Sequence, residues 1–227
     1  MSDPRDQYIG KVVKGKSFAD VGGLWGTVNE KVSVAHRYGA SSLAMIDISG
    51  PELWAPFEER RQALGLPEVR CIRGDVIALA ETSPGPKFDV VHCSGLLYHM
   101  PNPMQLLVAL RKMTSEYLVF TSAVSSTVVK SDQGVLEVPR AAALFVPALQ
   151  GKEREILSSY WQRFVGNGAI GLTHAAASWN PDDFAPWWWL PTVEALRAMC
   201  EVTGFHCKDG AHFWNNNAYV LLLSVRG

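Results

Sequence analysis

The sequence predicts an α/β fold: a doubly wound, mostly parallel seven-stranded sheet whose last strand is antiparallel. Three observations predict it. Short apolar runs recur along the first half of the chain and are typical of buried strands. Helix-like segments alternate with these runs at intervals of roughly 25–30 residues, as in successive βαβ units. The last two apolar runs are joined by Trp214-Asn215-Asn216-Asn217, a short polar turn that favours antiparallel pairing.

Five strands are expected before residue 125. Most are rich in Val, Ile or Phe, and their ranges are Ser17–Val21, Leu43–Ile48, Val69–Ile72, Phe88–Cys93 and Tyr117–Thr121. Helices are expected over Glu30–Tyr38, Pro51–Leu64 and Pro103–Met113. Pro51 suits a first helical turn, and Arg111 and Lys112 suit the last turn of the third helix. This half of the chain therefore predicts the parallel part of the sheet.

The alternation stops at residues 122–190, which we interpret as an insert between strands five and six. One helix, Lys152–Phe164, is expected there within a loop-rich tract that shows no clean strand alternation. Regular structure returns with a helix over Thr192–Thr203, in which Thr192 serves as the N-cap and Gly204 as the stop. Strands Phe205–Phe213 and Ala218–Val225 then close the sheet. Residues 1–227 are thus predicted to be one domain that carries a substrate-side insert.

Composition excludes several classes of protein. The 227 residues are 48% hydrophobic and 19% charged, with a formal net charge of −1. A DNA-binding surface is not expected and an RNA acceptor is not favoured, because both need basic residues in excess. No apolar run approaches the roughly 18–20 residues of a membrane span. Four cysteines without a Cys-x-x-Cys pair indicate a reducing compartment, so a cytoplasmic protein is expected.

One motif match is rejected on its context. Gly10, Gly15, Lys16 and Ser17 have the spacing of a P-loop. That loop binds phosphate only between a strand and a helix N-terminus. Here a strand follows Ser17, and the residues before Gly10 are interpreted as a polar tail, so a nucleoside triphosphate site is not predicted.

A glycine-rich turn after the first strand is the stronger candidate for a ligand site. Its residues are Asp20, Gly22, Gly23, Leu24 and Gly26. Glycines there let the backbone approach a ligand closely and adopt positive φ. A dinucleotide fingerprint would need glycines where Leu24 and Thr27 stand, so NAD is not expected. The alternative is a plain structural turn.

Two acids follow the next strands at the same edge of the sheet. Asp47, near the end of the second strand and followed by Ile48, could accept hydrogen bonds from a ribose diol. Asp75 follows the third strand and could accept from an adenine amino group, while Val76 covers the ring. The alternative for Asp47 is a helix cap or a solvated loop acid, and the alternative for Asp75 is a turn that contains the acid.

Together these features resemble the class I S-adenosylmethionine-dependent methyltransferases. The segment Phe88–Pro103, with its Leu97-Tyr98-His99, is similar to the family's fourth strand and following loop. The resemblance covers residues 17–121 and the final hairpin, and it departs from the family where Leu24 replaces the usual central glycine. It implies a Rossmann-like fold, S-adenosylmethionine as cofactor and S-adenosylhomocysteine as product. The residues it implies for cofactor binding are Asp20, Gly22, Gly23, Leu24, Gly26, Asp47, Ile48, Asp75, Val76, Cys93 and Ser94.

Methyl transfer to a hydroxyl needs a base that removes the proton. His99, just past the fourth strand, is the first candidate, and His174 in the insert is the second. In many relatives the histidine at the position of His99 only braces the loop. A divalent metal ion is an alternative that the spacing of Asp132, Asp182 and Asp183 does not favour, so no metal ligands are assigned.

Tryptophans concentrate in the insert, and we interpret them as a sign that the insert binds the substrate. Tyr98, Trp179, Trp187 and Trp188 are assigned to substrate binding, because indole faces stack on sugars and flat rings. A homodimer contact or core packing would use tryptophan equally well. The insert is interpreted as a lid that covers the acceptor and excludes water.

The expected activity is therefore methylation of a small molecule, at a hydroxyl on a saccharide or natural-product scaffold. Two alternatives stay within the fold: a methyltransferase acting on a tRNA base, and a module that binds S-adenosylmethionine without methylating. Leu24 and Trp25 in the glycine-rich turn motivate the second. A nucleoside-using enzyme of other chemistry on the same fold is a third.

Overall fold

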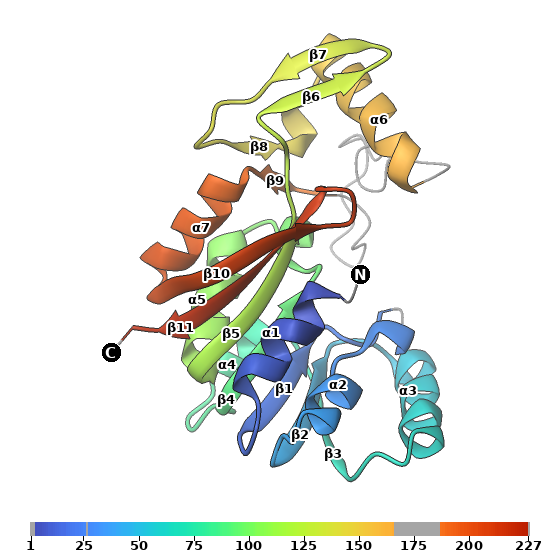
Figure 1. Ribbon diagram of the computed structural model, residues 1–227, viewed down its shortest axis with the longest axis vertical. Coiled ribbons are helices and arrows are strands. Elements are labelled where there is room, and N and C mark those ends of the chain that lie inside the picture. Colours follow the sequence, from blue (N-terminus) through green and yellow to red (C-terminus); the bar gives the residue numbers. More distant parts are fainter. Residues whose placement is uncertain (1–2, 26, 166–186, 227) are drawn as a thin grey trace.

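Seven strands form one sheet in the order β10-β11-β5-β4-β1-β2-β3. The computed structural model describes residues 3–25, 27–165 and 187–226. Strands β1 to β5 run parallel, whereas β11 pairs antiparallel with both β5 and β10 (Figure 1). The strands are β1 Ser17–Val21, β2 Ser42–Asp47, β3 Val69–Arg73, β4 Phe88–Ser94, β5 Thr114–Ala123, β10 Phe205–Phe213 and β11 Ala218–Val225. The predicted seven-stranded sheet with an antiparallel strand is confirmed.

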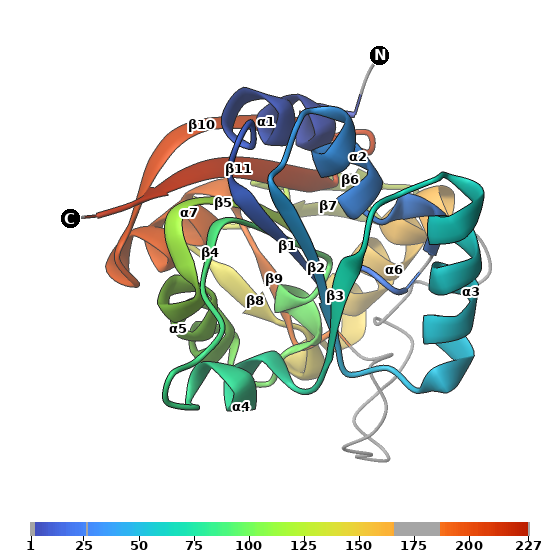
Figure 2. The ribbon, with the colours of Figure 1, turned by 90° about the horizontal axis from the view of Figure 1, so that it is seen from below.

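Helices cover both faces of the sheet, as Figure 2 shows from the amino ends of the parallel strands. Because successive strand residues point to opposite faces, Phe18 of β1 enters one core and Ala19 enters the other. The first core is covered by α1 Pro4–Val12, α2 Val32–Arg37 and α3 Pro51–Ala63. The second is covered by α4 Val76–Ala80, α5 Pro103–Met113 and α7 Val193–Val202. None of the helices in the described ranges is both long enough and apolar enough to cross a membrane.

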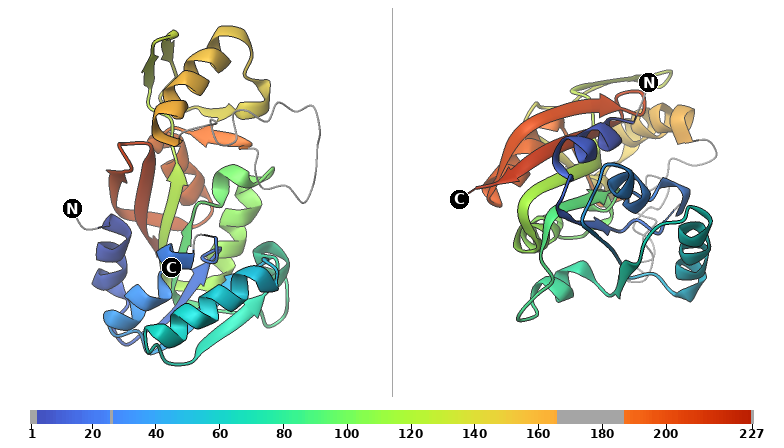
Figure 3. Two further views of the ribbon diagram at one scale, coloured as in Figure 1. Left: turned by 90° about the vertical axis from the view of Figure 1, so that its right-hand side faces the viewer. Right: turned by 60° about the horizontal axis from the view of Figure 1, so that its bottom comes forward.

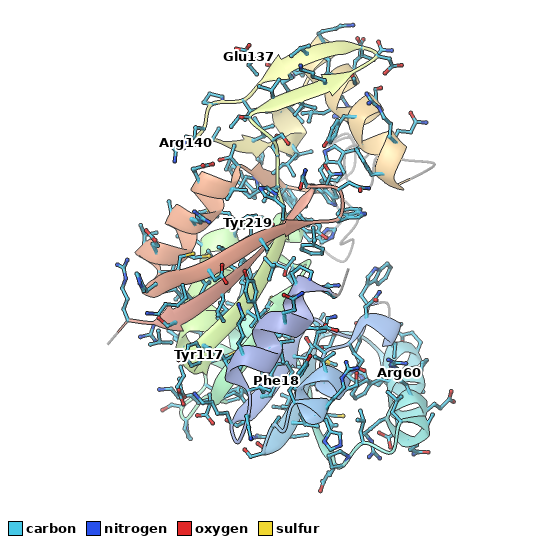
Figure 4. All side chains as sticks on the ribbon, viewed as in Figure 1. Phe18, Arg60, Tyr117, Glu137, Arg140 and Tyr219 are labelled. Atoms are coloured by element: carbon cyan, nitrogen blue, oxygen red, sulfur yellow. The ribbon has the colours of Figure 1, made fainter. Side chains whose placement is uncertain are left out.

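The insert packs over the carboxyl ends of the parallel strands and has a hydrophobic cluster of its own (Figure 3). Helix α6 packs on a hairpin, and a second short strand pair joins the insert to the segment before α7. These elements are β6 Val128–Ser131, β7 Gly134–Glu137, β8 Ala143–Phe145, α6 Gly151–Val165 and β9 Trp189–Pro191. Figure 4 marks Glu137 and Arg140 there, toward the opposite end of the molecule from Arg60 of α3.

The sequence predictions were wrong at four places, one of which is α4, because no helix was expected between the strands Val69–Ile72 and Phe88–Cys93. The N-terminal segment is a helix, α1, whose Tyr8 and Ile9 are buried against the sheet, and not a polar tail. The insert contains short strands as well as the predicted helix. The helix expected from Glu30 begins only at Val32, after a single 3-10 turn over Thr27–Asn29.

The structure also excludes a P-loop at Gly10–Ser17. Gly10 lies inside α1, and the chain reaches Ser17 through a turn at Gly15. A helix thus precedes this segment and a strand follows it, the reverse of the order that a phosphate-binding loop needs.

Candidate functional site

The predicted cofactor residues gather at one edge of the sheet because parallel strands bring their carboxyl ends together. Asp47 ends β2, Ser94 ends β4, and the turn from Gly22 follows β1, which lies between these two strands. Asp75 follows β3 at the outer edge of the sheet. The order along the edge is therefore Asp75, Asp47, the glycine-rich turn and Ser94.

Two glycines in this turn are required by local geometry. Gly22 has φ of +73°, and a Cβ built there would lie 2.8 Å from the Leu96 side chain. A Cβ on Gly23 would overlap the Asp20 carboxylate. Leu24, which replaces the family's central glycine, is fully buried in the core that carries Phe18, whereas Trp25 is 86% exposed. The departure at Leu24 thus adds to the core while the turn keeps its tight path.

Asp20 holds the glycine-rich turn in place through two buried contacts. Its Oδ1 lies 2.7 Å from Nδ1 of His92 on the neighbouring strand, and its Oδ2 accepts a 2.7 Å hydrogen bond from the backbone N–H of Lys31. The carboxylate is completely buried. Asp20 therefore joins β1, β4 and the start of α2, and so fixes the position of the glycine-rich turn.

Asp47 also contacts the turn directly. Its Oδ2 accepts from the backbone N–H of Leu24 at 3.1 Å, and its Oδ1 accepts from Ser49 at 2.9 Å. Each carboxylate oxygen has two acceptor sites, so ribose hydroxyls can be accepted in addition. Ile48, next in sequence, is 48% exposed at this edge, as a residue that covers a ligand ring would be.

Asp75 is the N-cap of α4. Its Oδ1 accepts from the backbone N–H groups of Ile77 and Ala78, both at 2.9 Å. Both bonds use the same oxygen, which leaves Oδ2 for another donor. Val76 begins the helix and is buried. Capping and adenine recognition are therefore compatible at Asp75.

The last two residues of β4, Cys93 and Ser94, lie in different surroundings. The Cys93 side chain is fully buried in the core, and burial, followed by the nearby Asp20 charge, raises the pKa of its thiol far above the usual value. A neutral, enclosed thiol is not a nucleophile. Ser94 turns outward and accepts a 3.2 Å hydrogen bond from Nη1 of Arg5.

A pocket of about 460 Å³ begins at Ser94 and continues along the edge over β5 and β11. It also reaches Asn29, in the 3-10 turn that follows the glycine-rich turn, and so adjoins the predicted cofactor edge. Its lining comes from segments that are distant in sequence: Arg5, Asn29, Ser94, Gly95, Tyr98, Thr121, Ala123, Phe213, Trp214 and Ala218.

Most of these pocket residues were missed by the sequence analysis. Arg5 lies in the segment interpreted as a tail, and Phe213 and Trp214 lie in the closing hairpin. A signal was available in the positions of Thr121 and Ala218, since one ends the expected strand Tyr117–Thr121 and the other begins the expected strand Ala218–Val225. Both had to lie at the carboxyl edge.

Tyr98 and His99 follow β4 in a 3-10 turn over Leu97–His99. Their rings are 4.4 Å apart, and Tyr98 lines the pocket. Burial raises the pKa of Tyr98 to about 12, because it disfavours the phenolate. Tyr98 is therefore neutral near pH 7 and suits hydrogen bonding, which leaves His99 as the described candidate for a base.

Trp187 and Trp188 are adjacent in sequence but have different neighbours. Trp187 is buried in the insert's cluster, 4.8 Å from the Trp161 ring and 5.0 Å from the Tyr98 ring. It packs behind Tyr98 and is not among the residues that line the pocket. Trp188 contacts Phe145, and its backbone N–H donates to the carbonyl of Tyr98 at 2.7 Å. The pocket's own indole comes from Trp214.

Three predicted site residues, Gly26, His174 and Trp179, lie outside the described residues, as do Asp182 and Asp183. Within the described ranges, no group of three or more His, Cys, Asp or Glu side chains is arranged to hold a metal ion.

Comparison with known proteins bears on the fold. No protein-family model and no curated protein matches the sequence. Among solved structures, the magnesium protoporphyrin IX methyltransferase of Synechocystis PCC 6803, with bound S-adenosylhomocysteine, is 15% identical, with a TM-score of 0.59 over 99% of this chain and 82% of that one. An S-adenosylmethionine-dependent methyltransferase from Clostridium acetobutylicum is 11% identical, with a TM-score of 0.59 over 100% and 93%.

The mitomycin 7-O-methyltransferase MmcR is 12% identical, with a TM-score of 0.58 over 98% of this chain and 53% of that one. The strand order, the antiparallel β11 and these solved structures all indicate the same fold. The chain has the Rossmann-like fold of the class I S-adenosylmethionine-dependent methyltransferases.

Proposed function

We propose that this protein is an S-adenosylmethionine-dependent methyltransferase that methylates a hydroxyl oxygen on a small molecule. One observation carries the proposal: the glycine-rich turn, two acids on successive strands and an adjoining pocket share one edge of the sheet. The solved neighbours support it, since they include enzymes named as methyltransferases of small molecules.

The residues at this edge fit the cofactor. The close backbone path at Gly22 and Gly23 would hold its methionine part, Asp47 its ribose hydroxyls, and Asp75 with Val76 its adenine. The cofactor supplies a methyl group on a positively charged sulfur. Asp20 is the positioning residue for this half of the site, because it fixes the turn relative to β4 and α2.

The acceptor would occupy the pocket beside Ser94. Methyl transfer is an in-line displacement, so much of the rate enhancement comes from holding the acceptor oxygen in line with the methyl group. His99 would remove the hydroxyl proton, with Tyr98 as a neutral neighbour. The aromatic lining from Tyr98, Phe213 and Trp214 favours a ring-containing natural product or a saccharide. RNA would need a more open and basic surface.

The test is turnover. The full chain is incubated with S-adenosylmethionine and a panel of hydroxylated aromatic compounds and saccharides. Release of S-adenosylhomocysteine and the product mass are then followed. A product heavier by one methylene group, whose formation is lost in Asp47→Ala, supports the proposal. Cofactor binding without any methylated product across the panel would favour a non-methylating module instead.

A further inference from the structure

We propose that Arg5 of α1 recognises the acceptor, and that the acceptor carries a carboxylate on a flat ring. This inference rests on the proposed function, since it names the class of molecule that occupies the pocket. The helix that supplies Arg5 is the segment that the sequence had indicated to be a tail.

Helix α1 is built to hold Arg5 in place. Ile9 is fully buried and Tyr8 is 5% exposed against the core of the sheet. Asp3 is the N-cap and accepts from the backbone N–H of Arg5 at 2.9 Å. The side chain of Arg5 then reaches Ser94 at the end of β4 and lines the pocket. The first residues of the helix thus project a cation into the site from outside the sheet.

The guanidinium keeps two donors for a ligand. Its Nε and Nη2 donate to Asp3, at 3.0 Å to each oxygen and 2.7 Å respectively, and its Nη1 donates to Ser94. A guanidinium has five N–H groups. One hydrogen each on Nη1 and Nη2 therefore has no acceptor among the described residues. Two adjacent donors on a planar group match the two oxygens of a carboxylate.

The surrounding charges leave room for an added anion. Asp3 is shared between Arg5 and Lys31, and Asp6 is shared between Lys31 and Arg37. Three cations thus face two carboxylates. Burial opposes ionisation of Asp3, but hydrogen bonds from Arg5 and Lys31 outweigh it and hold its pKa well below the usual value. The cluster therefore carries one positive charge in excess while Asp3 keeps Arg5 oriented.

The rest of the pocket suits a flat ring with polar substituents. The Phe213 ring lies 5.2 Å from Cζ of Arg5, and Tyr98 and Trp214 add further aromatic surface. Thr121, only 3% exposed, lines the same pocket, and its Oγ1 has no hydrogen-bond partner in the described part of the chain. A buried hydroxyl without a partner costs stability unless a ligand or water satisfies it. Thr121 therefore places an unsatisfied hydroxyl in the wall of the pocket.

The experiment compares matched pairs of flat probes that differ in charge only. The pairs are para-hydroxybenzoate with para-hydroxybenzamide, meta-hydroxybenzoate with its amide, and hydroxynaphthoate with its amide. Binding to the full chain is measured by calorimetry or ligand-observed NMR, with and without S-adenosylhomocysteine. The variants are Arg5→Gln and Arg5→Lys. Lys11→Gln, an exposed cation on the same helix that pairs with Asp209, is the matched control.

We expect the parent and Lys11→Gln to prefer at least one carboxylate over its amide by about 10-fold or more, as for a charge-assisted hydrogen bond. Arg5→Gln should abolish this preference, and Arg5→Lys, which keeps the charge but loses the planar fork, should retain part of it. Thermal melting confirms that each variant is folded. If no pair shows a preference in the parent, or if Arg5→Gln keeps the preference, the inference is overturned. Titration with S-adenosylhomocysteine on the same samples reports separately on the proposed function.

Discussion

Asp20 is the residue on which the geometry of the site depends most. Its two oxygens hold His92 and the backbone of Lys31, and its position leaves no room for a side chain at Gly23. Any change that displaces this buried carboxylate should therefore move the glycine-rich turn.

Gly23→Ala tests this dependence. The added Cβ would overlap the Asp20 carboxylate, so we expect affinity for S-adenosylhomocysteine to fall by about 10-fold or more along with stability. Gly15→Ala is the control: φ is +74° there, with no described atom within 4 Å of the new Cβ. It should lose about 1 kcal/mol of stability through backbone strain but keep its affinity. Equal affinity in both variants, measured by calorimetry, would contradict the account.

Substitutions of Tyr98 and of His99 should have different effects on kcat. Since burial raises the pKa of Tyr98 to about 12, its hydroxyl is neutral at working pH and is not the base. Tyr98→Phe should retain kcat within about 10-fold, the size of one lost hydrogen bond, whereas His99→Asn should lower kcat by about 100-fold or more. A larger loss of kcat in Tyr98→Phe than in His99→Asn would reverse the assignment.

At the scale of elements, α1 is the part of the fold that the sequence indicated least. Its residues are mostly polar, and only a few apolar side chains face the sheet, so no helical stripe stands out. The signals that were present are local: Asp3 as an N-cap and Pro4 in the first turn. Tertiary packing of Ile9, and not helix propensity, decides the outcome.

Ile9→Ala tests that packing. Removing a fully buried Ile side chain should lower the free energy of unfolding by about 2–5 kcal/mol. Lys11→Ala, at an exposed ion pair on the same helix, should change it by about 0.5 kcal/mol or less. Denaturant unfolding measures both. Indistinguishable midpoints for the two variants would mean that α1 is not packed on the sheet.

The strands of the sheet and most of the helices that connect them were predictable, whereas in the insert only helix α6 was. Buried parallel strands such as β1 and β4 are continuous apolar runs, and α5 begins and ends where Pro103 and Met113 predicted. The hairpin of β6 and β7 alternates between intermediate and exposed positions, with Val129 its buried residue, so its pattern is weak. Its stability comes from contact with α6, which spacing in the sequence does not reveal.

At the scale of the whole molecule, the site divides along the sheet edge. The residues of the half on β1, β2 and β3 could be placed at this edge from the sequence, because each lies at or just after the end of a strand. The half on β5, β11 and α1 could not, because Arg5, Thr121 and Trp214 meet only through the sheet order and the placement of α1. We propose that the first half binds the cofactor and that the second selects the acceptor.

The central claim, a cofactor site at this edge, is tested most directly by calorimetric titration of the parent and of Asp47→Ala with S-adenosylhomocysteine. Asp47→Ala removes the acceptor for Leu24 and for the ribose hydroxyls, so affinity should fall by about 10-fold or more. Asp209→Ala, at an exposed carboxylate on β10, should bind like the parent. Absence of binding by a folded parent, or equal affinity in Asp47→Ala and Asp209→Ala, would contradict the account.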